Sequence, residues 1–329
     1  MAPRSRCALL ALAIPLLAGC GGNQNVLNPE SPAEHSISNL FWIMMVGAWV
    51  GLGVVVVFLF LGWVRRNRRG LPSGGGEEAG ATLVLVLGLA VPIVVLSALF
   101  WYSDVHVIGE TSAPAANSTS LTVDVIGHQW FWEVRYPGKK VVTANELHIP
   151  ARTRVTVVAK TADVVHSFWV PRLNRKIDMI PGHPNRVLLY ANKPGVYGGR
   201  CSEFCGLQHA NMQLAVYADP PDKFRRWLQR QATPAAQTAA GRGKQVFLSQ
   251  ACADCHTIRG TDAKGTAGPD LTHLASRKTL AALTIPNERG YLRDWIRDPQ
   301  HFKPGNRMPD LGLSSAQIGD LVNYLESLR

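Results

Sequence analysis

The sequence predicts a membrane protein of three parts: a pair of transmembrane helices, a domain of short β strands, and a small helical domain at the C-terminal end. Two apolar segments without internal charges, 40–64 and 81–102, each reach the roughly 20 residues that cross a bilayer. Short strand-like runs separated by turn residues fill residues 121–218, and many such runs indicate a sandwich or barrel. After residue 243 the apolar residues recur at helical spacing.

Residues 1–19 have the pattern of an export signal. Arg4 and Arg6 precede an apolar run, Ala8–Leu17, that is too short to span a bilayer. The next residues, Leu17-Ala18-Gly19-Cys20, are similar to a bacterial lipoprotein signal, which implies cleavage before Cys20 and attachment of lipid to its thiol. The alternatives are a plain signal peptide or a third membrane helix.

The two apolar segments predict a helical hairpin within residues 20–104. The loop between them begins Arg65-Arg66-Asn67-Arg68-Arg69, and the positive-inside rule places such a loop in the cytoplasm. Both the N-terminus and everything after Tyr102 then lie outside. We therefore expect a multi-pass protein of a bacterial inner membrane whose remaining domains face the periplasm.

Charge and cysteine content narrow the functional classes. The net charge is +11, but no basic run is interleaved with aromatic residues, so nucleic acid is not an expected partner. Of the six cysteines, one lies in the signal, one is Cys20, and the others form two close pairs. A disulfide between Cys201 and Cys205 is the alternative to a metal-binding role in an oxidising compartment.

A β domain is predicted over residues 105–230 and a helical domain over 243–329, joined by an Ala/Pro-rich linker at 231–242. The expected strands are Leu121–Ile126, Phe131–Tyr136, Glu146–Ile149, Arg154–Lys160, Arg186–Ala191 and Gln213–Ala218. The expected helices are Phe224–Arg230, which closes the β domain, and then Gly243–Gln250, Arg289–Arg297 and Ser315–Leu328.

Twelve residues near the end of the β domain bring together soft metal ligands: Cys201, Cys205, His209 and Met212. His166 stands upstream, at the end of a strand-like run. Thiolate, thioether and imidazole in one set favour copper over magnesium, calcium or manganese. A single-copper blue site needs only one cysteine, whereas two cysteines can bridge two metals and let a copper pair share one electron.

A second motif, Cys252-Ala-Asp-Cys255-His256, is the C-x-x-C-H pattern of covalent haem c attachment. Cys252 and Cys255 would form the thioether bonds, and His256 would bind the iron. Met308 is the predicted sixth ligand, and a His/Met pair raises the reduction potential. His273 and His301 are its competitors. Three lysines are interpreted as a solvated face that could help docking, namely Lys264, Lys278 and Lys303.

Residues 40–230 resemble subunit II of the haem–copper cytochrome c oxidases. The matching segments are Gly127-His-Gln-Trp130-Phe-Trp132, Asp163-Val-Val-His166-Ser-Phe-Trp-Val-Pro171, Lys176-Ile-Asp178-Met-Ile-Pro-Gly182 and Cys201 to Met212. The resemblance implies a cupredoxin-like Greek-key β-barrel behind two membrane helices. It also implies a dinuclear copper centre, CuA.

The resemblance assigns a role to each copper-site residue. His166 and His209 would each bind one copper, Cys201 and Cys205 would bridge, and Met212 would supply a weak thioether. Glu203 would give its main-chain carbonyl to copper and its carboxylate to a magnesium ion shared with subunit I. Trp130 matches the residue through which electrons enter, with core packing as the alternative role. Asp163 and Asp178 match positions that orient a ligand or lie at a subunit contact.

Residues 243–329 resemble a class I cytochrome c, in which Gly243, Phe247 and Tyr324 match positions where the first and last helices cross. The order of lipoprotein signal, membrane hairpin, copper domain and cytochrome c resembles subunit II of caa-type oxidases. The family docks soluble cytochrome on an acidic face, whereas residues 105–240 hold 16 Lys/Arg against 9 Asp/Glu. A tethered haem domain, at a local concentration on the order of millimolar, would replace that face.

The predicted function is therefore the electron-input subunit of a respiratory oxidase. Electrons would pass from a cytochrome bc complex or soluble cytochrome c to haem c, to CuA, and to the haems of subunit I. There oxygen is reduced to water with proton pumping, and subunit III is a further expected partner. The alternatives are the corresponding subunit of a nitric oxide reductase and a copper carrier or assembly factor. A quinol oxidase subunit is excluded because that relative lacks the copper ligands.

Overall fold

The computed structural model describes residues 22–67, 76–115, 118–234 and 241–329. The predicted signal and Cys20 lie outside the described residues, as do Arg68, Arg69 and half of the predicted linker. The chain divides into two compact units, one formed by Pro32–Ser112 and the other by Met1–Ser31 together with Ala113–Arg329.

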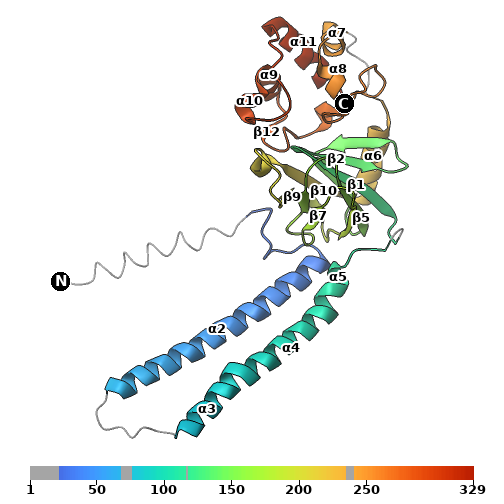
Figure 1. Ribbon diagram of the computed structural model, residues 1–329. Helices are drawn as coiled ribbons and strands as arrows, with labels where there is room; N and C mark the ends of the chain where they lie inside the picture. Colours follow the sequence, from blue (N-terminus) through green and yellow to red (C-terminus); the bar gives the residue numbers. More distant parts are fainter. Residues whose placement is uncertain (1–21, 68–75, 116–117, 235–240) are drawn as a thin grey trace, which may run out of the picture. The chain divides into compact units, whose positions relative to one another are not determined.

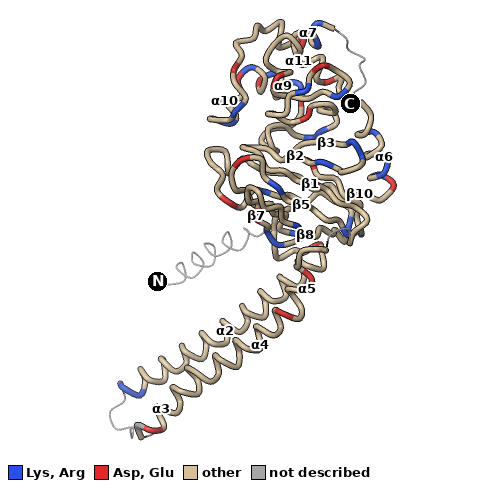
Figure 2. Tube along the Cα trace, turned by 45° about the vertical axis from the view of Figure 1, so that its right-hand side comes forward, with Lys and Arg blue, Asp and Glu red and all other residues tan. Residues whose placement is uncertain are grey.

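The smaller unit consists of two long apolar helices (Figure 1). The first, α2, spans Pro32–Asn67, and the second forms a continuous helical stretch over Glu78–Thr111. Their most apolar windows have mean hydropathies of 2.6 and 2.9 and no buried residues, as expected of helices that face lipid. Charged residues lie only near the helix ends (Figure 2). The two predicted membrane helices are confirmed.

The second helical stretch contains two π-helical turns. Its segments are α3 (Glu77–Leu85), η2 (Val86–Ala90), α4 (Val91–Ser103), η3 (Asp104–Ile108) and α5 (Gly109–Thr111). Both stretches extend beyond the apolar segments at 40–64 and 81–102, because a helix satisfies its own backbone hydrogen bonds and can continue into polar residues.

The predicted β domain is formed by two five-stranded sheets, β3-β2-β1-β5-β8 and β4-β10-β9-β6-β7. The strands are β1 (Leu121–His128), β2 (Phe131–Tyr136), β3 (Val141–Ala144), β4 (Glu146–Pro150), β5 (Val155–Thr161), β6 (His166–Trp169), β7 (Ile177–Met179), β8 (Asn185–Leu189), β9 (Gly195–Cys201) and β10 (Gln213–Asp219). β1 pairs antiparallel with β2 and parallel with β5. The fold is the cupredoxin-like one that was predicted.

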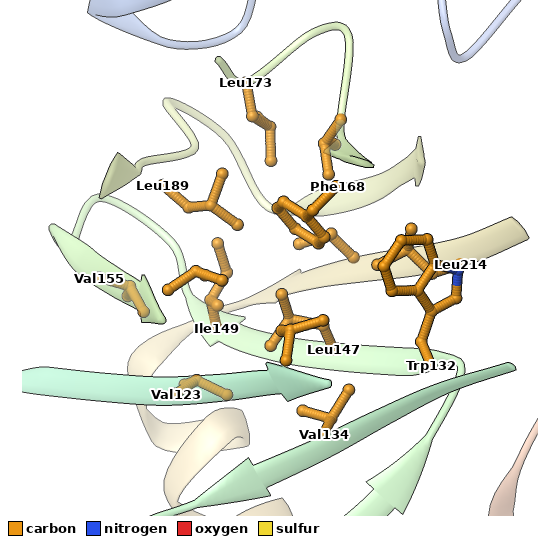
Figure 3. Packing of buried hydrophobic residues seen from close by; sticks show 14 of the residues in the cluster. Val123, Trp132, Val134, Leu147, Ile149, Val155, Phe168, Leu173, Leu189 and Leu214 are labelled. Atoms are coloured by element: carbon orange, nitrogen blue, oxygen red, sulfur yellow. The ribbon is translucent and has the colours of Figure 1, made fainter. Parts of the chain in front are cut away.

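Alternating apolar residues of the two sheets make the core (Figure 3). Val123 on β1 pairs with Val157 on β5, and both are fully buried. Leu147 on β4 and Leu214 on β10 face them from the other sheet. Trp132 is also fully buried. Helix α6 (Pro221–Ala232) covers this core through Phe224 and Trp227.

The C-terminal domain is helical apart from a two-stranded ribbon, β11 (Thr279–Leu280) and β12 (Ile285–Pro286). Its helices are α7 (Arg242–Ser249), α8 (Cys252–Cys255), the short 3-10 turn η5 (Leu274–Ser276), α9 (Arg289–Arg297), α10 (Pro299–Phe302) and α11 (Ser315–Glu326). A capping box at Ser314 and Gln317 starts α11.

Helices α7 and α11 cross where the resemblance to cytochrome c placed their contact. A Cβ at Gly243 would lie 2.1 Å from the main-chain oxygen of Asp320, so only glycine fits there. The rings of Phe247 and Tyr324 pack edge to face, with centroids 6.0 Å apart.

Candidate metal and haem sites

The predicted copper ligands gather at one end of the second sheet. Cys201 is the last residue of β9, and Met212 immediately precedes β10. The main-chain nitrogen of Cys201 donates to the oxygen of Met212 at 3.0 Å, which closes the base of the loop between them. That loop carries Cys205 and His209. His166 is the first residue of β6, rather than the end of a strand, and β6 pairs with β9.

The five side chains form one series of close contacts. Cys201 Sγ lies 3.7 Å from His166 Nδ1 and 3.8 Å from Cys205 Sγ. Cys205 Sγ lies 3.6 Å from His209 Nδ1 and 3.8 Å from Met212 Sδ. In zinc sites such atoms lie about 2.0–2.3 Å from the metal, so donors that share an ion are separated by distances of this size. The residues present therefore fit a soft metal.

The two cysteines of the loop are free thiols in this structure. Their sulfur atoms are 3.8 Å apart, whereas a disulfide bond is about 2.05 Å long. Both side chains are 3% exposed. The arrangement is that of two metal ligands, and the disulfide alternative is not what the structure contains.

The contact between the Cys201 and Cys205 thiols shifts their pKa values in opposite directions. A hydrogen bond from Cys205 is the main cause that lowers the pKa of Cys201, to about 3, and a further hydrogen bond from His166 acts against the effect of burial. The same sulfur–sulfur contact and burial raise the pKa of Cys205. One thiolate is thus available at neutral pH, and binding a metal through both sulfurs would release the second proton.

Asp163 orients the His166 ring. Its Oδ1 lies 2.9 Å from His166 Nε2, which leaves Nδ1 facing Cys201. Its Oδ2 accepts from the main-chain nitrogen of Gln129 at 2.7 Å. Burial would raise the pKa of Asp163, but hydrogen bonds led by that from His166 lower it overall. A Cβ at Gly127 would lie 2.8 Å from His166 Cδ2, so glycine is required beside the ring.

Replacing Asp163 with asparagine is expected to weaken copper binding by about 10- to 100-fold, the usual effect of losing a hydrogen-bonded carboxylate behind a metal-binding histidine. The affinity is measured by competition with a copper chelator. Asp222→Asn, at an exposed position on α6, is the matched control. Equal affinities for the two variants would contradict a role for Asp163 in orienting His166.

The main chain of Glu203 faces the predicted copper ligands, whereas its side chain faces solvent. Its main-chain oxygen lies 3.2 Å from Cys201 Sγ, while the residue is exposed to solvent. Its neighbours Phe204 and Leu207 are 78% and 79% exposed, which is unusual for large apolar residues in a domain with a well-packed core. The loop therefore offers an apolar surface with a carboxylate beside the copper ligands.

The haem motif borders a cavity of about 360 Å³. Cys252, Cys255, His256 and Met308 all line it, among mostly apolar side chains. His256 Nδ1 lies 2.8 Å from the oxygen of Pro269, which leaves Nε2 free to bind iron. Burial is the main cause that lowers the pKa of His256, so the ring is neutral. The residues present fit a haem c.

The other candidate iron ligands lie elsewhere. Neither His273 nor His301 lines the cavity. His273 is buried, with Nε2 3.0 Å from the oxygen of Thr233, and His301 is exposed. A Cβ at Gly268 would lie 2.5 Å from His256 Cε1, so this glycine leaves the space that the proximal ring occupies.

Trp130 lies between the two sites. Its Nε1 donates to the main-chain oxygen of Cys205 at 3.0 Å, and the residue also lines the cavity beside the haem motif. Gln129 Nε2 donates to the same oxygen at 2.8 Å. Trp132, in contrast, is buried in the core, where its ring packs edge to face with that of Phe168.

The interpretation of Lys303 as part of a solvated face is wrong. This residue is 3% exposed, and its Nζ donates to three main-chain oxygens, two of them in the β domain. Lys264 and Lys278 are exposed, as expected. The burial of Lys303 depends on contacts between distant segments, which a local pattern does not show.

Known proteins match the chain over nearly its whole length. The family profile described as "Cytochrome C oxidase subunit II, periplasmic domain" matches residues 138–218, and that described as "Cytochrome c" matches residues 240–329. The cytochrome c oxidase subunit 2 of Alkalihalophilus pseudofirmus is 31% identical, over 99% of this chain and 97% of that protein. The chain belongs to the cytochrome c oxidase subunit 2 family.

Two further proteins illustrate the similarity. Cytochrome c oxidase subunit 2 of Bacillus subtilis is 27% identical over 98% of this chain and 96% of that protein. The periplasmic domain of subunit II of the cytochrome oxidase of Bradyrhizobium japonicum, a solved structure, is 31% identical, covers 35% of this chain and 94% of that chain, and has a TM-score of 0.34.

Family membership confirms the coarse functional prediction. The chain is an electron-input subunit of a haem–copper oxidase, which is an oxidoreductase complex, and subunit I of that complex is its partner. Copper binds in the β domain and haem c in the C-terminal domain. It is a membrane protein with periplasmic domains, and a freely exchanging copper carrier is not supported.

Proposed function

We propose that this chain carries electrons from its own haem c to a dinuclear CuA centre and on to the haems of subunit I, for oxygen reduction coupled to proton pumping. When bound, the haem and the copper pair each take up and release one electron. One observation carries the proposal: Trp130 lines the haem cavity and also donates to the main-chain oxygen of the copper ligand Cys205.

The chain holds the two copper ions between its thiols in this proposal. Cys201 and Cys205 would be the ligands shared by both ions, because each sulfur contacts the other and a different histidine, His166 or His209. Met212 and the main-chain oxygen of Glu203 complete opposite ends of the set. Burial of this set, closed by strand pairing at its base, holds the donors in place, so that little geometry changes with the charge of the site.

Cys252 and Cys255 would attach the haem, and His256 and Met308 would hold its iron. His256 is held by the Pro269 oxygen. Asn306 accepts from the main-chain nitrogen of Met308 at 2.8 Å, which fixes the loop that presents the thioether. The apolar cavity excludes water and favours the ferrous state together with the thioether ligand.

Trp130 provides the contact between the two sites, and Glu203 provides the contact with subunit I. The Trp130 ring is within 3.0 Å of the position that a Cβ on Gly206 would take, so it packs directly on the copper loop. The exposed Glu203 carboxylate is a hard ligand that suits magnesium. Its neighbours in the loop are apolar and exposed, as a surface covered by another subunit would be.

We also propose the remaining organisation inferred from the sequence. Residues 1–19 are a removed signal and Cys20 carries lipid. The hairpin occupies 20–104, the copper domain 105–230, the linker 231–242 and the haem domain 243–329. The membrane is the bacterial inner membrane, subunit III is a second partner, and a cytochrome bc complex or soluble cytochrome c is the donor.

The order of electron transfer tests this function. The purified oxidase, fully oxidised and without oxygen, is mixed with a limiting amount of a one-electron donor. We expect the haem c absorbance to change first and the near-infrared absorbance of CuA to follow before the haems of subunit I. If those haems are reduced while the CuA absorbance stays unchanged throughout, the proposed order is wrong.

A further inference from the structure

Lys303 belongs to the haem domain but is buried against the copper domain. It follows α10 directly, and its Nζ donates to the oxygen of Trp130 at 3.1 Å and to that of Asn211 at 3.0 Å. A third bond, at 3.3 Å, goes to Ala281 in its own domain. An ammonium group has three N–H donors, so all of them are used, and two bind the other domain.

The environment of this ammonium group contains carbonyl oxygens in place of a carboxylate. Within the part of the chain that the structure describes, no ion pair involves Lys303. Burial lowers its pKa to about 8. A buried charge without a counterion reduces the stability of the fold. The burial of the Lys303 ammonium group therefore indicates a role other than stabilising the fold.

The two carbonyls that Lys303 binds in the copper domain belong to the electron path. Trp130 lines the haem cavity and contacts the Cys205 main chain. Asn211 directly precedes the copper ligand Met212. The ammonium group of Lys303 therefore connects the turn between β1 and β2 with the ligand loop, and it connects both with the haem domain.

Neighbouring contacts follow the same pattern. Gln208 Nε2 in the ligand loop donates to the oxygen of Pro304 at 2.7 Å. Arg307 Nη2 donates to Gln129 Oε1 at 2.5 Å. The residues from 303 to 307, which we call the docking segment, thus lie against 129–130 and 208–211. The docking segment leads directly to the iron ligand Met308.

A second contact lies at another edge of the same interface. Arg259 of the haem domain donates through Nη1 to the oxygen of Lys140 at 2.7 Å and through Nη2 to that of Gln231 at 2.6 Å. Among the described residues, no ion pair joins the copper domain to the haem domain. Cations of the haem domain can therefore dock on a basic partner, because Lys303 and Arg259 bind its main-chain carbonyls and Arg307 binds the amide oxygen of Gln129.

We propose that Lys303 is a positioning residue that docks the haem domain on the copper loop through the main-chain oxygens of Trp130 and Asn211, without an acidic docking surface. This inference rests on the proposed function. Hydrogen bonds to buried carbonyls act at short range and are little affected by salt. Electron transfer from haem c to copper within the chain is therefore insensitive to ionic strength.

The test uses the complete oxidase with Lys303→Met, which keeps most of the length of the side chain and removes its donors. The haem c of the oxidised complex is reduced by a rapid photochemical donor, and its reoxidation by CuA is followed at low and high salt. Loss of two charge-assisted bonds is expected to slow this transfer roughly 10-fold or more. The haem spectrum, the haem potential and the CuA resonance stay unchanged, which separates a docking role from a general structural one.

Lys264→Met is the matched control, because it removes the same charge from an exposed position of the same domain. Its transfer rate should equal that of the unmodified complex. Equal rates for the Lys303 and Lys264 variants, or strong salt dependence of the unmodified complex, would overturn the proposal. If Lys303→Met fails to retain haem, Lys303→Leu replaces it, and a rate equal to that of the control overturns the proposal as well. Failure of the underlying function is distinct, because the unmodified complex would then show no transfer to copper.

Discussion

Replacing Cys201 with serine is expected to remove both copper ions from the β domain and to abolish oxidase turnover with an external donor. Cys201 Sγ contacts His166, Cys205 and the Glu203 oxygen, so it joins the donors at one end of the set to the second thiol. Serine offers a harder oxygen that is protonated at neutral pH and is a poor ligand for copper. Loss of one bridging ligand should therefore empty the whole centre.

The measurement is the copper content of the purified oxidase, which should fall by two per complex, together with loss of the CuA resonance. Cys252→Ser is the matched comparison, because it removes a thiol from the haem motif and should leave copper unchanged. A loss of a single copper ion in the Cys201 variant would contradict the dinuclear assignment. Retention of both ions would contradict the ligand role of this thiol.

The ligands could be predicted from the sequence because each motif is short and its spacing is chemically demanding. Cys201 to Met212 span one loop and the strand end before it, and the C-x-x-C-H motif spans a short helix and the residue after it. The spacing of the ligands along the chain therefore largely determines how they lie in space. The membrane helices could be predicted equally well, because a helix that crosses a bilayer must be long and apolar in any fold. Six strands and four helices were also found near their observed positions.

Features that depend on long-range pairing could not be predicted in this way. Strand β9 was not expected, since Gly195, Gly198 and Gly199 are typical of turns. A Cβ at Gly199 would lie 2.8 Å from the oxygen of Trp169, which shows that the close approach of β6 demands the glycine. The short strands β3, β6 and β7 were also missed. Their three or four residues carry too little periodicity to be recognised alone.

The burial of Lys303 also depends on residues far away in the chain and could not be predicted from the local sequence. Its partners Trp130 and Asn211 are 173 and 92 residues away in the chain, and a lysine is most often exposed. Asp163 was easier to find, because it precedes His166 by only three residues. Sequence reasoning thus identified the donors and one of their supporting groups, while the contacts between the two domains required the fold.

Replacing Met308 with alanine is expected to leave haem covalently attached but to lower its reduction potential. Attachment depends on Cys252 and Cys255, which the change does not touch. The thioether favours ferrous iron, and axial ligands change haem potentials over a range of about 0.8 V. We therefore expect a decrease on the order of 100 mV or more, with an altered spectrum of the oxidised haem. Redox titration of the oxidase measures both.

The direction of the potential change determines what happens to turnover. A lower potential makes transfer from haem c to copper more favourable and transfer from the donor to haem c less favourable. Turnover with a weakly reducing cytochrome donor should therefore fall, whereas turnover with a strong chemical reductant should fall much less. His301→Ala, at an exposed position outside the haem cavity, should change neither. If the Met308 variant kept the normal spectrum and potential while a variant of His301 or His273 lost them, the sixth ligand would be that histidine.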